Sequence, residues 1–278
     1  MQTAIITGGA GGMGLATAKI LGRDHRVVIA DVNQERLDAA VAELTALGVD
    51  AEAVVSDITD RASVDDLMMR GNATGELRAV VHTAGVSPQM GKPEFIVRIN
   101  ALGTINVAES ALAVATEGFA LVNVASIAGH TAPGFLVSKR RNRLAFTDPE
   151  RLVKRMTAAA NLGPKSLKAG FAYSLSKQFV IWYSEQMAAR FGAKGARVLS
   201  VSPGSFDTTM GQLEKKSGSE RLLLAAALKR FGKPEEMAEL LAFCASDKAG
   251  YLTGIDILND GGTKAGMDFA TTLKIARG

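Results

Sequence analysis

A tyrosine and a lysine in the second half of the chain have the spacing of an acid–base pair. Tyr173 and Lys177 stand four residues apart, so a helix would carry both on one face. A phenol with a pKa of about 10 is a poor base at neutral pH, and a nearby cation lowers that pKa. The pair could therefore move a proton to or from a substrate oxygen, although an exposed helix face would show the same spacing.

A serine beyond an apolar run could complete this chemistry. Ser126 follows the segment Ala120–Val124 closely, and we predict that this segment is a strand. Ligands of open α/β sheets bind at the carboxyl ends of the strands, where Ser126 would lie. Its hydroxyl could there stabilise charge that develops on a substrate oxygen.

A glycine-rich loop near the N-terminus predicts a phosphate site. Residues 7–14 read Thr-Gly-Gly-Ala-Gly-Gly-Met-Gly, between a strand candidate and a helix candidate. Glycines let the backbone approach a pyrophosphate, and the helix N-terminus offers free N–H groups. The loop alone is a weak signal, because many such loops are only turns.

An acidic residue after the second strand candidate indicates which dinucleotide would bind. Asp31 follows Val27–Ala30 and lies about 20 residues beyond the glycine loop. A carboxylate there accepts hydrogen bonds from the adenosine ribose and repels a 2′-phosphate. No arginine stands at position 31, 32 or 33. We therefore expect NAD (NADH) rather than NADP, although an aspartate here could also cap the next helix.

The elements that must position these residues alternate along the chain. Predicted strands are Thr3–Thr7, Val27–Ala30, Ala51–Val55, Ala79–His82, Ala120–Val124, Arg197–Val201 and Ile255–Leu258. Predicted helices include Met13–Leu21, Glu35–Leu47, Ala172–Arg190 and Pro234–Ala245. This alternation predicts an α/β fold, a doubly wound parallel sheet of Rossmann-like type with three α/β/α layers.

One segment interrupts the alternation. Residues 129–170 are basic, contain prolines and offer no strand, but Pro149–Ala160 with Asp148 as N-cap predicts one helix. We interpret the segment as an insertion in a single domain of residues 1–278, with a short tail at 263–278. No repeat and no low-complexity linker divides the chain.

Composition argues against several functions. The 278 residues are 47% hydrophobic and 22% charged, with a net charge of +4, as in ordinary globular proteins. The basic run at 139–143 is too short for a nucleic-acid site. Cys244 is the only cysteine, so we expect neither an intrachain disulfide nor a metal site. The absence of a signal peptide and of a membrane-spanning stretch predicts a cytoplasmic protein without a membrane partner.

Together the motifs resemble the short-chain dehydrogenase/reductase family, of the compact kind. The resemblance runs from Thr3 to about Gly262 and rests on Thr7-Gly8-x-x-x-Gly12-x-Gly14, Thr83-Ala84-Gly85, Asn100, Ser126, Tyr173-x-x-x-Lys177, Pro203-Gly204 and Asp260-Gly261-Gly262. It implies an NAD-dependent oxidoreductase that interconverts a small-molecule secondary alcohol and its ketone.

The resemblance also implies a role for each matched residue. Tyr173 would be the acid/base, Lys177 would lower its pKa and bind the nicotinamide ribose, and Ser126 would bind the substrate oxygen. Asn100 would hold a water that relays protons. The other residues would contact the cofactor: Gly8, Gly12, Met13 and Gly14 at the pyrophosphate, Asp31 at the adenosine ribose, Asp57 and Ile58 at the adenine, Ala84 and Gly85 along the adenosine half, and Pro203, Gly204, Phe206 and Thr208 around the nicotinamide.

The chain departs from the family pattern in two places. His82 opens His-Thr-Ala-Gly where Asn-Asn-Ala-Gly is usual, and we interpret it as a strand-end residue held by neighbouring backbone rather than as a catalyst. Tyr173 follows Ser126 by 47 residues, far more than usual. Members resembling bacterial 3α-hydroxysteroid dehydrogenase/carbonyl reductase have a similar insertion, which suggests a bulky hydrophobic substrate. A helix predicted over residues 209–229 could close over it or be ordinary core.

Other functions and the assembly state stay open. A regulatory protein could bind NAD without chemistry, and a lyase or epimerase could use the same fold. The intact set of Ser126, Tyr173 and Lys177 argues against the first, and the compact glycine spacing argues against the second. The family implies a homo-oligomer, dimer or tetramer, and the insertion could block or replace the usual pairing of helices. Asn106, Glu109 and Asp207 have no assigned role.

Overall fold

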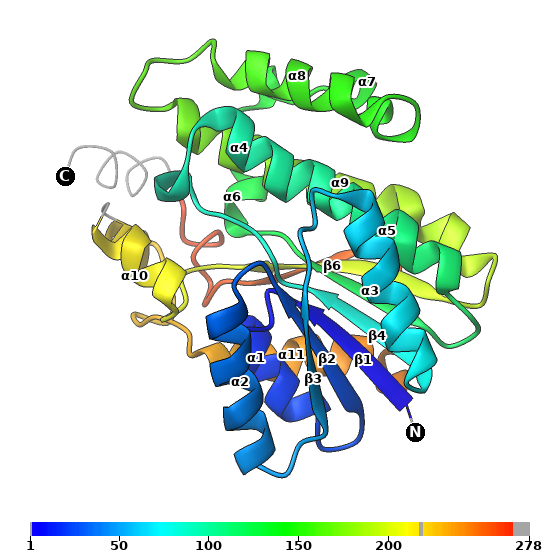
Figure 1. Cartoon of the computed structure of the whole chain (residues 1–278). Coiled ribbons are helices and arrows are strands. Elements are labelled where there is room, and N and C mark those ends of the chain that lie inside the picture. Colours follow the sequence, from blue (N-terminus) through cyan, green and yellow to red (C-terminus); the bar gives the residue numbers. More distant parts are fainter. Residues whose placement is uncertain (1, 217–218, 269–278) are drawn as a thin grey trace.

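A seven-stranded parallel sheet forms the centre of the molecule in a computed structural model that describes residues 2–216 and 219–268 (Figure 1). The strand order is β3-β2-β1-β4-β5-β6-β7. The strands are β1 Gln2–Thr7, β2 Arg26–Asp31, β3 Ala51–Val55, β4 Glu76–His82, β5 Ala120–Val124, β6 Arg197–Pro203 and β7 Asp256–Asn259. The predicted fold class is confirmed.

Helices cover both faces of the sheet, so its central strands are apolar on both sides. One face carries α1 (Gly12–Leu21), α2 (Gln34–Ala46) and α11 (Pro234–Ala245), and the other carries α3 (Arg61–Ala73), α4 (Pro93–Val97), α5 (Gly103–Val114) and α9 (Lys168–Gly192). Ile5 and Ile6 are neighbours in β1 and fully buried, and they belong to the two different apolar clusters. This alternation explains why the strands read as continuous hydrophobic runs.

The predicted elements agree with the structure except in one region. β3, β5 and α11 have their predicted bounds, and the other strands are shifted or extended by a few residues. The single helix predicted over residues 209–229 is wrong. α10 spans only Thr209–Lys216, and a 3₁₀ turn covers Ser219–Leu224. An apolar pattern alone does not reveal such a break.

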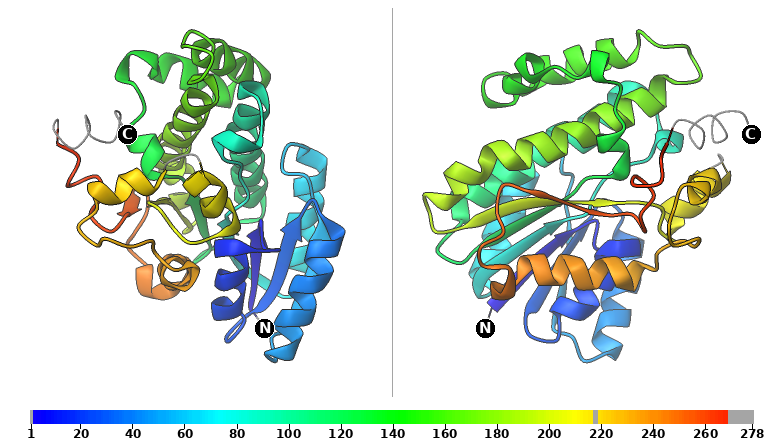
Figure 2. Two further views of the ribbon diagram at one scale, coloured as in Figure 1. Left: turned by 90° about the vertical axis from the view of Figure 1, so that its left-hand side faces the viewer. Right: turned by 180° about the vertical axis from the view of Figure 1, so that it is seen from behind.

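The segment 129–170 forms an outer layer over α4 and α9 (Figure 2). It includes the end of α6 (Ile127–His130), then α7 (Lys139–Asn142) and α8 (Pro149–Ala160), and it contains no strand. The predicted N-cap of α8 is confirmed, since the Asp148 side chain accepts a 2.9 Å hydrogen bond from the Arg151 amide. Leu152, Val153 and Met156 of α8 are fully buried, so this layer shares the core of the molecule.

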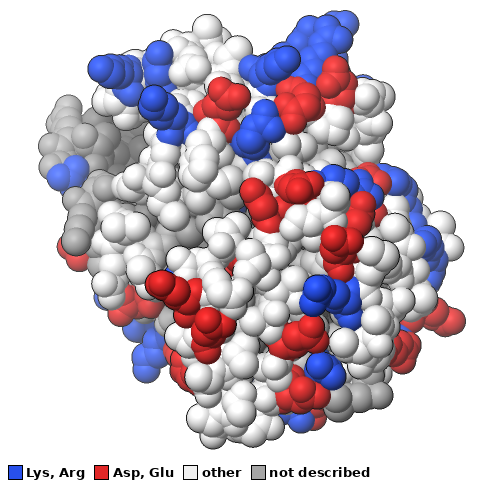
Figure 3. Space-filling model, viewed as in Figure 1, with Lys and Arg blue, Asp and Glu red and all other residues white. Residues whose placement is uncertain are grey.

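Charges are mixed on the surface. Basic and acidic side chains are interspersed over the face shown in Figure 3, and basic ones gather around α7 and α8 at its top. Within residues 2–216 and 219–268, no helix combines the length and the apolar character that crossing a membrane requires.

Candidate active site

A cavity of about 840 Å³ opens at the carboxyl ends of the central strands. Its lining contains every predicted site residue except Asn100: Gly8, Gly12, Met13, Gly14, Asp31, Asp57, Ile58, Ala84, Gly85, Ser126, Tyr173, Lys177, Pro203, Gly204, Phe206 and Thr208. These residues come from segments that the sequence separates by up to 200 positions. The parallel sheet brings them together, because all its strands end at the same edge.

The glycine loop is shaped for the close approach of a ligand. Gly8 has a φ of +68°, which favours glycine. A Cβ on Gly14 would collide with the carbonyl oxygen of Gly8. Helix α1 begins without a side-chain cap, so its first N–H groups are available to an anion. The loop therefore fits a dinucleotide pyrophosphate.

The next part of the cavity has the groups expected for an adenosine. Asp31 ends β2, and its carboxylate accepts a long hydrogen bond, 3.3 Å, from the Asn33 amide. The carbonyl oxygen of Ile58 accepts a 2.9 Å hydrogen bond from Asn106 Nδ2. Asn106, which had no role from the sequence, thus fixes the segment predicted to contact the adenine.

The predicted acid–base pair lies on α9 with both side chains on the cavity wall. Lys177 Nζ is 6.0 Å from the centroid of the Tyr173 ring and donates a 2.9 Å hydrogen bond to the carbonyl oxygen of Val124, the last residue of β5. The lysine therefore joins α9 to the strand that leads to Ser126.

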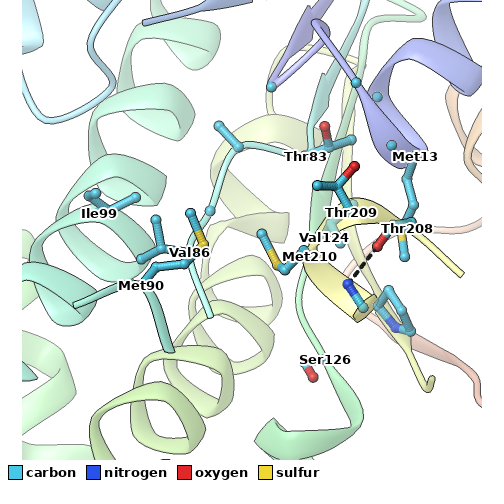
Figure 4. A pocket seen from close by; sticks show the side chains of 18 of the residues that line it. Met13, Thr83, Val86, Met90, Ile99, Val124, Ser126, Thr208, Thr209 and Met210 are labelled. Carbon is cyan, nitrogen blue, oxygen red and sulfur yellow. Dashed lines mark hydrogen bonds between the residues drawn. The ribbon is translucent and has the colours of Figure 1, made fainter. Parts of the chain in front are cut away.

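Ser126 is the N-cap of α6. Its Oγ accepts a 3.2 Å hydrogen bond from the Ala128 amide, which leaves the hydroxyl hydrogen able to bond a substrate oxygen. Figure 4 shows Ser126 on the segment that leaves β5, below Val124 and Met210. One short helix thus positions a hydroxyl donor at the site.

Asn100 lies behind the cavity wall in a π-helical turn, Arg98–Leu102, between α4 and α5. Its side chain is locked by Val86, whose amide donates to Oδ1 at 2.9 Å and whose carbonyl oxygen accepts from Nδ2 at 3.0 Å. A Cβ on Gly85 would lie 3.1 Å from Asn100 Oδ1 and 3.4 Å from Lys177 Nζ. Asn100 is therefore close to Lys177, and its role in proton relay stays a prediction.

His82 is held differently from the prediction. Side-chain hydroxyls bind it rather than neighbouring backbone: Nδ1 lies 2.7 Å from Thr7 Oγ1 and Nε2 lies 3.2 Å from Thr104 Oγ1. Complete burial, together with the charge of Lys177, lowers the pKa of His82 from 6.5 to about 3. The imidazole is thus neutral at physiological pH and does not line the cavity.

Several cavity residues were missed by the sequence analysis. The substrate side is apolar, with Val86, Met90 and Ile99 on one wall and Met210 on the opposite wall (Figure 4). These residues belong to none of the sequence motifs, so only packing places them at the cavity. Arg36 also lines the cavity. Its position five residues after Asp31 was the only available signal.

Comparisons with known proteins agree with this geometry. Residues 2–138 match the family model described as short chain dehydrogenase, and residues 154–264 match that described as Enoyl-(Acyl carrier protein) reductase. The chain is 27% identical over 272 residues to 3-oxoacyl-[acyl-carrier-protein] reductase FabG of Thermotoga maritima, covering 94% of this chain and 97% of that protein. It is 29% identical over 277 residues to 2-(S)-hydroxypropyl-CoM dehydrogenase 3 of Xanthobacter autotrophicus, covering 94% and 95%.

Solved structures show the same fold. A short chain dehydrogenase from Burkholderia cenocepacia J2315 in complex with NADP superimposes with a TM-score of 0.74 at 25% identity, over 94% of this chain and 97% of that one. A short-chain type dehydrogenase/reductase from Mycobacterium ulcerans gives 0.74 at 26% identity, over 98% and 94%. The chain therefore belongs to the short-chain dehydrogenase/reductase family of oxidoreductases, which bind a nicotinamide cofactor.

Proposed function

We propose that this chain is an NAD(H)-dependent oxidoreductase that interconverts a bulky, hydrophobic secondary alcohol and its ketone. The observation that carries the proposal is the composition of one cavity. Ser126, Tyr173 and Lys177 line the same space as the glycine loop and Asp31. A substrate oxygen at the first three groups would lie beside a nicotinamide whose phosphates rest on the loop.

Each catalytic side chain has one task in this proposal. Bound nicotinamide supplies or accepts the hydride. In reduction, the Tyr173 hydroxyl gives its proton to the carbonyl oxygen, and in oxidation the phenolate takes a proton from the alcohol. The Lys177 cation stabilises the phenolate, while the Ser126 hydroxyl donates to the substrate oxygen and stabilises charge on it. Asn100 supports proton exchange behind Lys177.

Asp31 supports a preference for NAD(H). Its carboxylate can accept hydrogen bonds from the adenosine ribose, and it repels a 2′-phosphate. The NADP complex of the Burkholderia relative makes this preference a point to measure rather than a family property.

The apolar walls support the hydrophobic substrate. Val86, Met90, Ile99, Met210, Leu213 and Leu222 all line the cavity, and a large apolar group would displace water from them. Leu213 and Leu222 belong to the region, residues 209–229, for which the sequence left open a lid or ordinary core. The resemblance to bacterial 3α-hydroxysteroid dehydrogenase/carbonyl reductase points to the same substrate class and stays a prediction.

We also propose a single domain that assembles into a homo-oligomer. The fully buried side chains of α8 support a single domain, because they show that the insertion contributes to the core. The layer over α4 and α9 removes part of the surface available for pairing with a second subunit. The tail residues 269–278, which could take part in assembly, lie outside the described residues.

Fluorescence titration with NADH and NADPH, followed by a panel of bulky secondary alcohols that includes hydroxysteroids, tests the proposal. We expect NADH binding and turnover of at least one alcohol, and Tyr173→Phe should lower kcat by about 100-fold or more with NADH affinity within about twofold. Full activity of this variant would contradict the assigned acid/base. NADH binding without any turnover would favour a regulatory protein.

A further inference from the structure

An arginine from α2 lies over the glycine loop. Arg36 stands in the first turn of α2, and a Cβ on Gly11 would lie 2.8 Å from its Nη2. The guanidinium therefore occupies the space that a side chain at position 11 would need. Because Gly11 has none, an arginine that is distant in sequence can reach the loop.

The Arg36 guanidinium has no protein partner in the part of the chain that the structure describes, residues 2–216 and 219–268. Only its backbone amide is engaged, donating a 2.9 Å hydrogen bond to Asn33 Oδ1. By contrast, Arg26, Arg61, Arg78 and Arg98 each pair with a carboxylate. A solvated arginine is common on a surface, but this one lines the same cavity as Asp31.

We propose that Arg36 is a second determinant of cofactor choice and binds the 2′-phosphate of NADP(H). A guanidinium can give a phosphate two parallel hydrogen bonds, and an arginine near the ribose is a known means of accepting the 2′-phosphate. Asp31 and Arg36 then act in opposite directions on the same group. The carboxylate repels the phosphate and the guanidinium attracts it.

The consequence is a site that accepts both NADH and NADPH. The enzyme prefers NADH because Asp31 bonds the ribose hydroxyls, yet it still accepts NADPH because Arg36 compensates part of the repulsion. This inference rests on the proposed function, which puts the adenosine ribose at the end of β2. It adds that Arg36, acting against Asp31, sets how strongly the protein distinguishes the two cofactors.

Equilibrium titrations of NADH and NADPH against the native protein, Arg36→Ala, Asp31→Ser and the double variant test the inference without measuring turnover. We expect Arg36→Ala to raise the Kd for NADPH by about tenfold or more and that for NADH by less than about threefold. Asp31→Ser should tighten NADPH binding, and the added Arg36→Ala should remove that gain. Arg36→Lys should keep part of the affinity, because it keeps the charge but loses the two-point contact.

A matched control variant and a second ligand test whether the effect is specific to Arg36 and to the adenosine half of the cofactor. Arg23→Ala removes an exposed arginine from the loop between α1 and β2, at the opposite edge of the sheet, and should leave both affinities unchanged. Displacement of NADH by 2′,5′-ADP isolates the adenosine half and should weaken in Arg36→Ala.

The outcomes distinguish the inference from the proposed function. Equal weakening of both cofactors by Arg36→Ala would mean a contact to adenine or pyrophosphate, and no change would mean a solvated side chain. Either result overturns the inference and leaves the proposed function standing. Failure of NADH to bind the native protein would overturn the proposed function itself.

Discussion

At the scale of single residues, His82 joins the glycine loop to the turn that carries Asn100. Thr104 donates a 2.8 Å hydrogen bond to the Asn100 carbonyl oxygen, so its oxygen accepts from Nε2–H of the imidazole. The other nitrogen, Nδ1, then accepts from the Thr7 hydroxyl. The network thus assigns one neutral tautomer, and every donor in it points from β1 toward the π-helical turn.

His82 predicts a specific dependence of stability on pH. The unfolded chain binds a proton at this residue below about pH 6.5, whereas the folded state does so only below a pKa of about 3. The contribution of His82 to the free energy of unfolding is therefore complete above pH 6.5. It is lost as the pH falls toward 3, by up to about 1.4 kcal/mol for each pH unit. Urea unfolding at pH 7, 5 and 4 measures this loss.

His82→Gln provides the comparison, because an amide offers a donor and an acceptor but does not titrate in this range. The variant should be less stable at pH 7 by about 1–3 kcal/mol, and its deficit should shrink as the pH falls. A constant difference between the two proteins from pH 7 to pH 4 would contradict a neutral buried imidazole in the native state.

At the scale of elements, α6 sets the position of Ser126 through its contacts at both ends. The helix begins at the serine and ends at His130, whose Nε2 lies 2.8 Å from Asp256 Oδ2 on β7. Asp256 also accepts a hydrogen bond from Ser200 on β6 at 2.6 Å. In between, Gly129 packs on α9: a Cβ there would lie 2.8 Å from the backbone carbon of Lys177.

Gly129→Ala should therefore separate α6 from α9 and misalign Ser126 with Tyr173 and Lys177. A displacement of about 1 Å can cost about 100-fold in rate, so we expect kcat to fall by about 10- to 100-fold while NADH affinity changes by less than about twofold. Steady-state kinetics and NADH titration measure both quantities.

Gly170→Ala is the matched control for this change. Gly170 lies in the first turn of α9, where an added Cβ would meet nothing within 4 Å. Alanine there should leave kcat unchanged and be neutral or slightly stabilising. If both alanine variants behaved alike, close packing at Gly129 would not explain the position of Ser126.

At the scale of the whole molecule, the insertion is packed as part of the core. The only tryptophan, Trp182 on α9, contacts the Phe146 ring of the insertion with centroids 6.1 Å apart. A bidentate ion pair between Arg98 and Glu150, with both N–O distances at 2.8 Å, connects the turn of Asn100 to α8. The insertion therefore helps to hold the turn that carries Asn100, behind the cavity wall.

This packing predicts one cooperative unfolding transition. Trp182 fluorescence should report the insertion and far-ultraviolet circular dichroism the whole chain, so the two urea curves should coincide. Leu152→Ala should shift both by about 2–5 kcal/mol, whereas Leu162→Ala at an 80% exposed position should cost less than about 0.5 kcal/mol. An early fluorescence transition would indicate an insertion that unfolds on its own.

The sequence by itself determined the order and type of most elements, and all the site residues it predicted except Asn100 line the cavity. β-Branched runs, the glycine loop and the Tyr173–Lys177 spacing are local patterns, and local patterns report the conformation of a short stretch of chain. The parallel topology then implied that their strand ends meet. The fold class and the helix over Pro149–Ala160 followed from this information alone.

Only the tertiary structure decided the contacts between distant segments. The guanidinium of Arg36 over Gly11, the hydroxyl partners of His82 and the contact of Gly129 with α9 depend on how helices and strands pack, and packing is a property of three-dimensional neighbours rather than of sequence spacing. The same reason explains the two corrections. A hydrophobic pattern did not show where α10 ends, and a histidine at a strand end did not reveal the threonines that bind it.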